Sequence, residues 1–376
     1  MTRKIPFYHH DLGSPELEAI AEVLRGPMLT TGDTVAEFER RFAGYMGMPH
    51  AVGVTSWTGG AQIALTALGV GPGDEVITTP LTFIATATAI IQAGATPVFV
   101  DVEPGTGNLD AARVEQAITA RTKALMPVHL YGQMCDMRTL RAVADRHRLV
   151  IVEDCAHCVE GDRDGVRPGL LSEAACFSFF ATKNLTCGEG GAVVTRDESL
   201  ARSLRLLRLH GMDKTSADRQ RSGYQHWDMT VMGWKYNMDN LQAALLLPQF
   251  ARLESKLATR SRLAELYFEL LNGVPGLSWP ERVEGSRHAN HLFTVWVDGG
   301  RRDDVITRLQ SMGISVVVNY RAIHQLTYFR ERFGFAPDAF PNARRIGDQT
   351  ISLPFYPGMP EQDVHDVARA LREILT

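Results

Sequence analysis

Between residues 50 and 200, short apolar runs alternate with stretches whose apolar residues recur at helical spacing. The apolar runs predict strands at 51–56, 74–80, 96–102, 123–132 and 149–157. The stretches between them predict helices at 59–70, 82–94, 108–119 and 136–148. Near-continuous Val and Ile runs separated by helices are typical of a mostly parallel sheet with helices on both faces.

Two further strands are predicted close together, at 176–182 and 190–197, which makes seven strands in all. A connection this short cannot carry a helical crossover. We therefore expect an antiparallel pair in an otherwise parallel α/β sheet.

After residue 240 the pattern changes. A long helical pattern covers 240–273, and Pro248 near its start either kinks the helix or occupies its first turn. Strand patterns at 291–300 and 314–320 and helical patterns at 301–313 and 361–375 follow. We predict a large domain of residues 1–250 and a small C-terminal α+β domain of residues 251–376.

Composition and charge narrow the class of protein. The chain has 376 residues, of which 45% are hydrophobic and 22% charged, and this composition is typical of a globular protein with two domains. A formal net charge of -4 gives no support for nucleic-acid binding through a basic field. The sequence shows no long uncharged apolar run and no signal-peptide core, so we expect a cytoplasmic protein with no membrane partner.

The five cysteines do not suggest the disulfide framework of a secreted protein. Cys155 and Cys158 form a C-x-x-C with His157 between them. A zinc or redox pair is one interpretation, but a structural zinc site usually needs a second ligand pair at matching spacing. We expect buried structural thiols and no metal.

Polar residues follow several predicted strands, and ligands bind beyond the carboxyl ends of parallel strands. Thr58 and Gly59 follow the first strand and begin a helix. Free N–H groups at a helix start can bind a phosphate, although an ordinary strand-to-helix turn has the same pattern. The turn is not G-x-G-x-x-G, which disfavours a dinucleotide site.

Asp154 ends the apolar run of the fifth strand, and Lys183 follows the run at 176–182, which contains Ser178. The carboxylate is either a helix cap or a charge partner in a site. The lysine is either a surface residue or, beside an apolar strand, an amine with a lowered pKa that reacts with carbonyl groups. A phosphate site, a carboxylate and a lysine at one sheet edge are the groups that pyridoxal 5'-phosphate (PLP) requires.

Over nearly its whole length the chain resembles the DegT-type sugar aminotransferases, which are fold-type I PLP enzymes. The segments that carry the resemblance include LTTGDTVAEFERRFAGYMG, GVGPGDEVITTPLTFIATATAIIQAGATPVFVDV, VIVEDCAH, FSFFATKNLTCGEGGAVVT and GWKYNMDNLQAALLLPQ. The resemblance implies PLP as the cofactor and an aspartate aminotransferase-like sheet with a smaller C-terminal domain.

The resemblance also implies roles for single residues. Lys183 binds the aldehyde of PLP and later moves a proton between cofactor and substrate. Asp154 pairs with the pyridine nitrogen, and Phe83 stacks on the ring. His157 takes the position near the ring 3-hydroxyl where relatives have Gln or His.

Other implied roles concern the phosphate and the sugar. Thr58, Gly59 and Ser178 hold the phosphate. Asn237 reaches the phosphate of the partner subunit, which implies an obligate homodimer with shared active sites. The glycine-rich segment 188–191 lets the backbone pass close to the cofactor.

The residues Tyr320 and His324 lie where the small domain approaches the sugar, and the resemblance implies that they bind substrate. One departure from the family is Trp57, because many relatives have Ser-Gly-Thr where this chain has Ser-Trp-Thr. The bulky indole either narrows the phosphate site or packs under the sheet.

These roles together predict a nucleotide-sugar aminotransferase of amino-sugar biosynthesis. L-glutamate gives its amino group and leaves as 2-oxoglutarate, and a nucleotide-linked keto sugar accepts the group. A 4-keto-6-deoxyhexose is the first choice and a 3-keto sugar the second. The product would enter a surface polysaccharide, a glycan or an antibiotic.

Three alternatives are weaker. A PLP-dependent sugar dehydratase is disfavoured, because such relatives carry His where this chain has Lys183. A non-catalytic regulatory relative would be expected to lose Lys183, Asp154 or the GEGG segment. A nicotinamide-dependent oxidoreductase is disfavoured by the missing glycine fingerprint.

Overall fold

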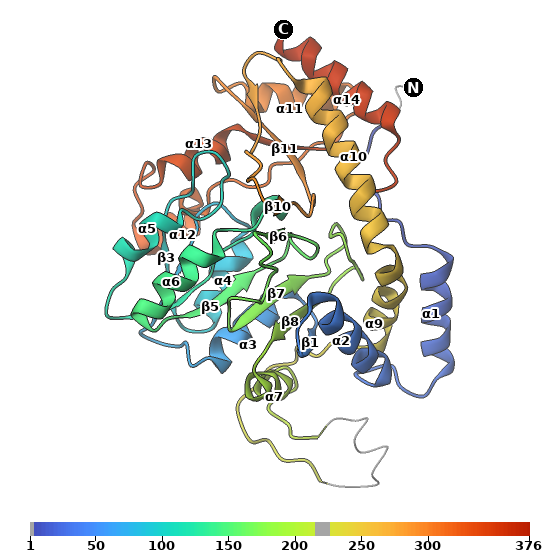
Figure 1. Cartoon of the computed structure of the whole chain (residues 1–376), viewed down its shortest axis with the longest axis vertical. Coiled ribbons are helices and arrows are strands. Elements are labelled where there is room, and N and C mark those ends of the chain that lie inside the picture. The colour runs from blue at the N-terminus through green and yellow to red at the C-terminus, as the bar shows by residue number, and fades with distance from the viewer. Residues whose placement is uncertain (1–3, 215–225) are drawn as a thin grey trace.

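The structure, a computed structural model, describes residues 4–214 and 226–376. Its centre is a seven-stranded sheet with the order β1-β8-β7-β5-β4-β2-β3 (Figure 1). The strands are β1 (His50–Val54), β2 (Glu75–Thr78), β3 (Thr96–Phe99), β4 (Thr122–Leu125), β5 (Val150–Asp154), β7 (Ala174–Ser178) and β8 (Gly191–Thr195).

The pairing of the strands confirms the expected mixed sheet. β2 is parallel to β3 and β4, β4 is parallel to β5, and β5 is parallel to β7. β8 is antiparallel to both β7 and β1. The short link between β7 and β8, which cannot hold a crossover helix, is the segment that carries Lys183.

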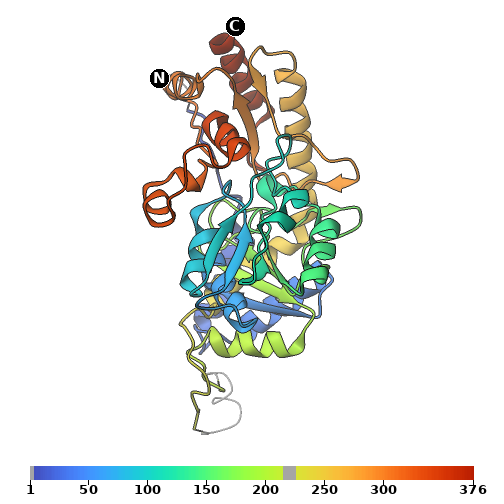
Figure 2. The same ribbon diagram turned by 90° about the vertical axis from the view of Figure 1, so that its left-hand side faces the viewer.

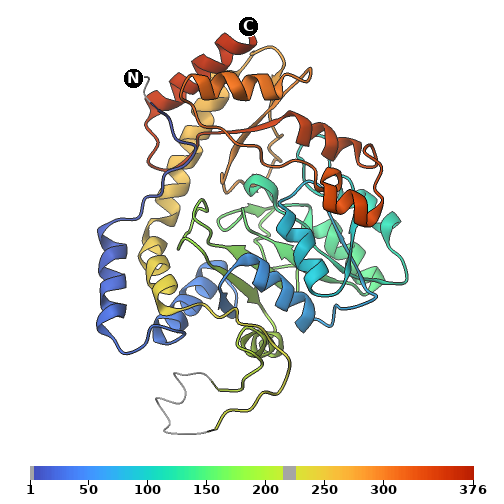
Figure 3. The ribbon, with the colours of Figure 1, turned by 180° about the vertical axis from the view of Figure 1, so that it is seen from behind.

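Helices cover both faces of this sheet, because successive residues of its buried strands pack on opposite sides. In β7, Ala174 and Cys176 pack with α3 and α7, whereas Ala175 and Phe177 pack with α2 and α9 (Figures 1 and 3). The helices of this part are α1 (Ser14–Arg25), α2 (Asp33–Met46), α3 (Trp57–Ala67), α4 (Ile84–Gln92), α5 (Ala111–Val114), α6 (Met137–His147), α7 (Glu198–Leu207) and α9 (Asn240–Leu246).

Pro248 interrupts the long helical pattern that begins at residue 240. α9 is followed by a 3-10 segment, η3 (Leu247–Arg252), with the proline in its first turn, and then by α10 (Leu253–Leu271). Proline has no N–H to donate, so the first turn of a helical segment tolerates it. α10 extends from the sheet into the C-terminal part of the chain (Figure 2).

The C-terminal part holds a small antiparallel sheet of β9 (Leu277–Ser278), β11 (Phe293–Val297) and β12 (Thr350–Leu353). Its helices are α11 (Arg302–Ser311), α12 (Thr327–Phe333), α13 (Pro341–Gln349) and α14 (Glu361–Leu375). Shorter elements of the chain are η1 (Glu115–Ala117), η2 (Leu130–Gly132), η4 (Ile323–Gln325) and the pair β6 (Asp162–Arg163) and β10 (Ser286–Arg287).

The prediction of a strand at 314–320 is wrong. Ile314 and Val317 make only isolated bridges, to Ile5 and Ser352. The carbonyl of Asn319 accepts hydrogen bonds from the hydroxyls of Tyr131 and Thr350 instead of joining a ladder. β12 takes the place beside β11.

α10 contacts two hydrophobic cores. Leu253 packs into a core of the large sheet, and the residues from Leu263 onward pack with β11, α11 and α14. Ile5 joins this second core. The division into domains of residues 1–250 and 251–376 stays a prediction. Within the described residues, no helix is both long enough and apolar enough to cross a membrane.

Candidate active site

A cavity of about 610 Å³ lies at the carboxyl ends of the parallel strands, between the large sheet and the C-terminal part. Segments far apart in the sequence meet in its wall. Seven of the site residues predicted from the sequence line this wall: Thr58, Phe83, Asp154, His157, Ser178, Lys183 and Tyr320.

Lys183 projects its amine into this cavity from the turn after β7, where its backbone N–H donates to the carbonyl of Phe180. Burial lowers the pKa of the amine to about 8, and the negative charge of Asp154 opposes that shift. A neutral amine, which is the nucleophilic form, is therefore accessible near neutral pH.

Asp154 ends β5 and is only 4% exposed. One carboxylate oxygen, Oδ2, accepts a hydrogen bond of 2.7 Å from the hydroxyl of Thr86, and Oδ1 accepts one of 3.1 Å from the backbone N–H of Ala156. Burial raises the pKa of this carboxyl, and the hydrogen bonds and Lys183 lower it. A buried carboxylate held in this way is a suitable partner for a protonated ring nitrogen.

The ring of His157 is held at both nitrogens. The backbone N–H of Tyr131 donates to Nδ1 at 3.2 Å, so the proton of the neutral ring lies on Nε2, which is 3.1 Å from the hydroxyl oxygen of Tyr320. Burial, with the charge of Lys183, lowers the pKa of His157 well below its ordinary value. The imidazole is therefore neutral and donates toward Tyr320.

The start of α3 lies at one end of the cavity, where Ser56, Trp57 and Thr58 line its wall. Ser56 caps this helix, and its hydroxyl accepts a hydrogen bond from the backbone N–H of Gly59. The hydroxyl residues Thr58 and Ser178 line the wall nearby. Hydroxyl groups at the N-terminus of a helix suit a phosphate.

Gly59 is not among the residues of the cavity wall, and its predicted role toward the phosphate stays a prediction. A Cβ at this position would lie 2.9 Å from the ring of Tyr236. Trp57 belongs to the cavity wall, but it is only 6% exposed and its indole N–H donates to the carbonyl of Cys176 in β7, so the indole packs under the sheet. A cavity of about 610 Å³ remains beside it, and the indole therefore does not close the site.

Two other predicted residues lie outside the cavity wall of this chain. The amide nitrogen of Asn237 donates to the hydroxyl of Thr31 at 2.8 Å. His324 is buried in η4, where its Nε2 lies 3.3 Å from the carbonyl oxygen of Pro337 and its ring meets Phe340 edge to face. Their predicted roles toward the phosphate and the sugar remain predictions.

His291, which was not among the predicted site residues, precedes β11 and lines the cavity. Its Nε2 lies 3.5 Å from the Lys183 Nζ, and its ring centroid is 4.4 Å from that of His157. Thr86, which fixes Asp154, was missed as well. A histidine before a strand and a threonine inside a helix carry no signal of a site until the fold brings them together.

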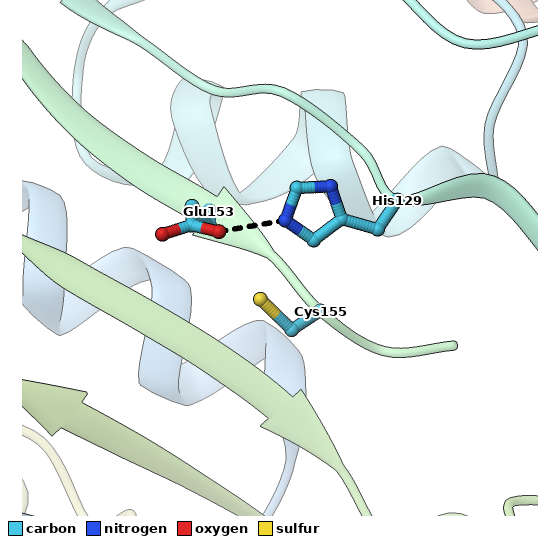
Figure 4. A group of neighbouring side chains, drawn as sticks. All are labelled: His129, Glu153 and Cys155. Carbon is cyan, nitrogen blue, oxygen red and sulfur yellow. Dashed lines mark hydrogen bonds and ion pairs between the residues drawn. The ribbon is translucent and has the colours of Figure 1, made fainter. Parts of the chain in front are cut away.

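All five cysteines are buried, unpaired thiols in the described part of the chain, as expected. One of them, Cys155, lies with His129 and Glu153 in a group that could offer three metal ligands (Figure 4). Hydrogen bonds already account for this group. His129 Nε2 lies 2.6 Å from a carboxylate oxygen of Glu153, and Nδ1 accepts from the backbone N–H of Cys135.

The second oxygen of Glu153 accepts hydrogen bonds from the backbone N–H of Gly169 and the hydroxyl of Ser172. Burial raises the pKa of the Cys155 thiol, which favours its protonated form. We interpret the group as a structural network that anchors β5.

The donor set of the cavity fits PLP. It offers a reactive amine, a fixed buried carboxylate and hydroxyl groups at a helix start, which match the aldehyde, ring nitrogen and phosphate of that cofactor.

Comparison with known proteins gives the same picture. Residues 10–372 match the model of the DegT/DnrJ/EryC1/StrS aminotransferase family. The chain is 42% identical to the spore coat polysaccharide biosynthesis protein SpsC of Bacillus subtilis (strain 168), over 99% of this chain and 97% of that protein.

Solved structures agree closely as well. DesV of S. venezuelae is 38% identical, with a TM-score of 0.92 over 99% of this chain and 98% of that one. Spr1654 of Streptococcus pneumoniae, described as a sugar aminotransferase, is 30% identical in its PMP-form, with a TM-score of 0.93 over 98% of both chains. A PLP-form of the same protein has also been solved.

Proposed function

The chain belongs to the DegT/DnrJ/EryC1/StrS aminotransferase family of PLP-dependent enzymes, and we propose that it moves the amino group of L-glutamate to a keto group of a nucleotide-linked sugar. Its fold is that of the fold-type I PLP aminotransferases. In the proposed reaction, glutamate leaves as 2-oxoglutarate and the sugar becomes an amino sugar.

The observation that carries this proposal is that Lys183 and Asp154 line the same cavity and that the charge of Asp154 acts on the amine. PLP, when bound, supplies a reactive aldehyde and a ring that withdraws electrons. Asp154, fixed by Thr86, would hold the proton on the ring nitrogen. Lys183 would react through its neutral amine and would hold or move a proton at Nζ.

The remaining wall orients the cofactor and the substrate in this proposal. Phe83 would stack on the ring, His157 would lie near the ring hydroxyl, and Thr58 and Ser178 would hold the phosphate. Tyr320 approaches the sugar from the C-terminal part, where its hydroxyl already meets His157.

The names of the relatives support a sugar as the class of acceptor. SpsC takes part in spore coat polysaccharide biosynthesis, and Spr1654 is described as a sugar aminotransferase. We propose a 4-keto-6-deoxyhexose as the acceptor, with a 3-keto sugar second, and a polysaccharide as the fate of the product. Lys183 in the cavity argues against the dehydratase alternative.

We further propose a homodimer with shared active sites. In this arrangement, Asn237 serves the phosphate of the partner subunit and His324 contributes to the sugar site.

The experiment that tests the function is visible absorbance of the purified protein loaded with PLP, before and after L-glutamate. We expect a visible band that glutamate bleaches, after which a panel of nucleotide-linked keto sugars restores it. A band that ignores glutamate would reject this donor. Lys183→Ala is the control, because it should lose the band and all turnover.

A further inference from the structure

The cavity wall continues into the protein through a buried line of polar side chains behind Lys183. We propose that Glu160, Asn184 and His291 form a hydrogen-bonded chain that presents an unprotonated ring nitrogen to the Lys183 amine and so orients it. Glu160 and Asn184 are positioning residues that act through His291. The inference rests on the proposed function only in taking Lys183 as the reactive amine.

The first link fixes the side-chain amide of Asn184. Glu160 is 1% exposed, and both of its carboxylate oxygens lie 3.1 Å from Asn184 Nδ2. The same nitrogen donates to the carbonyl of Ala289 at 2.8 Å. A backbone carbonyl can only accept, so the amide nitrogen must face it and the amide oxygen must face the other way.

The second link fixes the tautomer of His291. Asn184 Oδ1 lies 3.4 Å from His291 Nδ1, and an amide oxygen can only accept, so Nδ1 carries a proton. Burial and the neighbouring groups Lys183, His157, Arg260 and His288 lower the pKa of His291 well below its ordinary value. A neutral imidazole has one N–H, so Nε2 is unprotonated.

The third link is the contact with the amine. His291 Nε2 lies 3.5 Å from Lys183 Nζ, at the long end of hydrogen-bond distances. In the cavity wall, His157 cannot play this role, because its own Nε2 carries the proton and faces Tyr320. His291 is therefore the imidazole that accepts a hydrogen bond from Lys183.

The backbone around His291 holds the ring in place. Arg260, which is buried in α10, donates to the carbonyls of Asn290 and His291 at 3.2 Å each. The backbone N–H of His291 donates to the carbonyl of Tyr131. Rigid placement of this kind limits the directions that the amine can take, which is the geometric part of catalysis.

The chain offers a matched pair of variants. In His291→Gln, the longer amide can place an oxygen near the position of Nε2, whereas in His291→Asn the amide reaches only the position of Nδ1. The two variants therefore differ in the acceptor for Lys183 while keeping a polar side chain beside Asn184.

The first measurement uses protein without cofactor, so it does not depend on the proposed reaction. Lys183 is labelled with acetic anhydride over a range of pH and quantified by mass spectrometry. A hydrogen-bond acceptor favours the ammonium form. We expect the pH midpoint of Lys183 acetylation to be lower in His291→Asn than in the wild type. In His291→Gln the midpoint should stay near the wild-type value.

Other groups that face this pair are Asp154 and His157 beside Lys183, Arg260 and His288 beside His291, and Arg260 and Arg287 beside Glu160. These groups are unchanged in the wild type, in His291→Asn and in His291→Gln. An unchanged midpoint in His291→Asn would overturn the inference.

The second measurement is read on the wild-type protein, and a variant serves only to assign the resonance. In wild-type protein labelled with ¹⁵N-histidine, NMR should show the His291 proton on Nδ1, with the resonance assigned by its loss in His291→Gln. A proton on Nε2 would contradict the proposal.

The third measurement uses the loaded enzyme. The single-turnover rate of bleaching by glutamate should fall about tenfold to hundredfold in His291→Asn and much less in His291→Gln. If the wild type fails to bleach, the proposed donor is wrong, and the labelling and NMR measurements still decide the role of His291.

Discussion

At Lys183, burial and charge act on the amine in opposite directions. Loss of water favours the neutral form, and the carboxylate of Asp154 favours the ammonium form. Burial is the larger effect and lowers the pKa to about 8. A much larger share of the amine is thus reactive near neutral pH than in a free lysine.

The first prediction follows for the pH dependence of cofactor uptake. The rate at which cofactor-free protein forms its visible band with PLP should rise with a midpoint near pH 8, because the neutral amine appears there. Stopped-flow absorbance at a series of pH values measures it. A midpoint near that of free lysine, about 10.4, would show that burial does not control the amine.

The second prediction concerns Thr86, whose hydroxyl holds one oxygen of Asp154. Thr86→Val keeps the shape and removes the donor, so a buried acceptor loses its partner at a cost of about 1–3 kcal/mol. The glutamate half-reaction should slow, because Asp154 is less fixed and less readily ionised.

The matched control for that variant is Thr88→Val on the same helix. The hydroxyl of Thr88 donates to the backbone carbonyl of Ala85 and has no contact with Asp154. Thermal unfolding measures the loss of stability, and single-turnover absorbance measures the rate of the glutamate half-reaction. Equal half-reaction rates in the two variants would exclude a role for Thr86.

At the scale of elements, β8 and the start of α3 approach each other closely beside the cavity. A Cβ added to Gly191, the first residue of β8, would lie 2.7–2.8 Å from backbone atoms of Ser56, Trp57 and Phe177. Backbone atoms cannot move aside as flexible side chains can. The close approach therefore depends on glycine.

The third prediction is that Gly191→Ala destabilises the protein by about 1–3 kcal/mol and weakens PLP binding, because it separates β8 from the start of α3. Gly44→Ala in α2 is the control, since nothing lies within 4 Å of its added Cβ. It should be neutral or slightly stabilising. Urea unfolding measures the stability of both variants, and cofactor titration measures their affinity for PLP. Equal stability and equal affinity in Gly191→Ala and Gly44→Ala would contradict the steric argument.

Across the whole molecule, the buried Glu160 links stability to pH. Burial raises the pKa of this carboxyl from 4.5 to about 7, although Asn184 and Arg260 oppose the shift. Between these two values the folded protein binds more protons than the unfolded chain does. The contribution of Glu160 to the free energy of unfolding therefore falls as pH rises from about 4.5 to about 7.

The fourth prediction is that Glu160→Gln, which removes the charge and keeps an acceptor for Asn184, gains stability over the wild type as pH rises. The gain should approach roughly 3 kcal/mol above pH 7 and vanish below pH 4.5. Urea unfolding at pH 5 and pH 8 measures it. Glu373→Gln, at an exposed position of α14, is the control. A difference in unfolding free energy between Glu160→Gln and the wild type that does not change with pH would contradict the raised pKa of Glu160.

The fifth prediction tests the shared active sites of the proposed homodimer. Lys183→Ala chains and Asn237→Ala chains should each be impaired alone. A mixed dimer should regain activity, because one of its sites then receives an intact lysine from one chain and an intact asparagine from the other. The two chains are co-expressed with different affinity tags, and the activity of the doubly tagged dimer is measured. A mixed dimer without recovered activity would place Asn237 outside the partner's site.

Much of the fold followed from local pattern. Val and Ile runs separated by helices predicted a mostly parallel sheet, and the short link after β7 predicted the antiparallel β8. The strand expected at 314–320 failed, because the Asn319 carbonyl binds side-chain hydroxyls from distant segments. Apolar pattern alone does not show which polar groups a segment will meet.

The sequence by itself determined the sheet, the family resemblance and the placing of Asp154, Ser178 and Lys183 at one edge, because parallel strands end at the same edge of a sheet. Only the tertiary structure decided that Trp57 packs under the sheet and that His291 lies against Lys183. Those outcomes depend on contacts between residues far apart in the chain and on side-chain direction, and periodicity along a sequence carries neither.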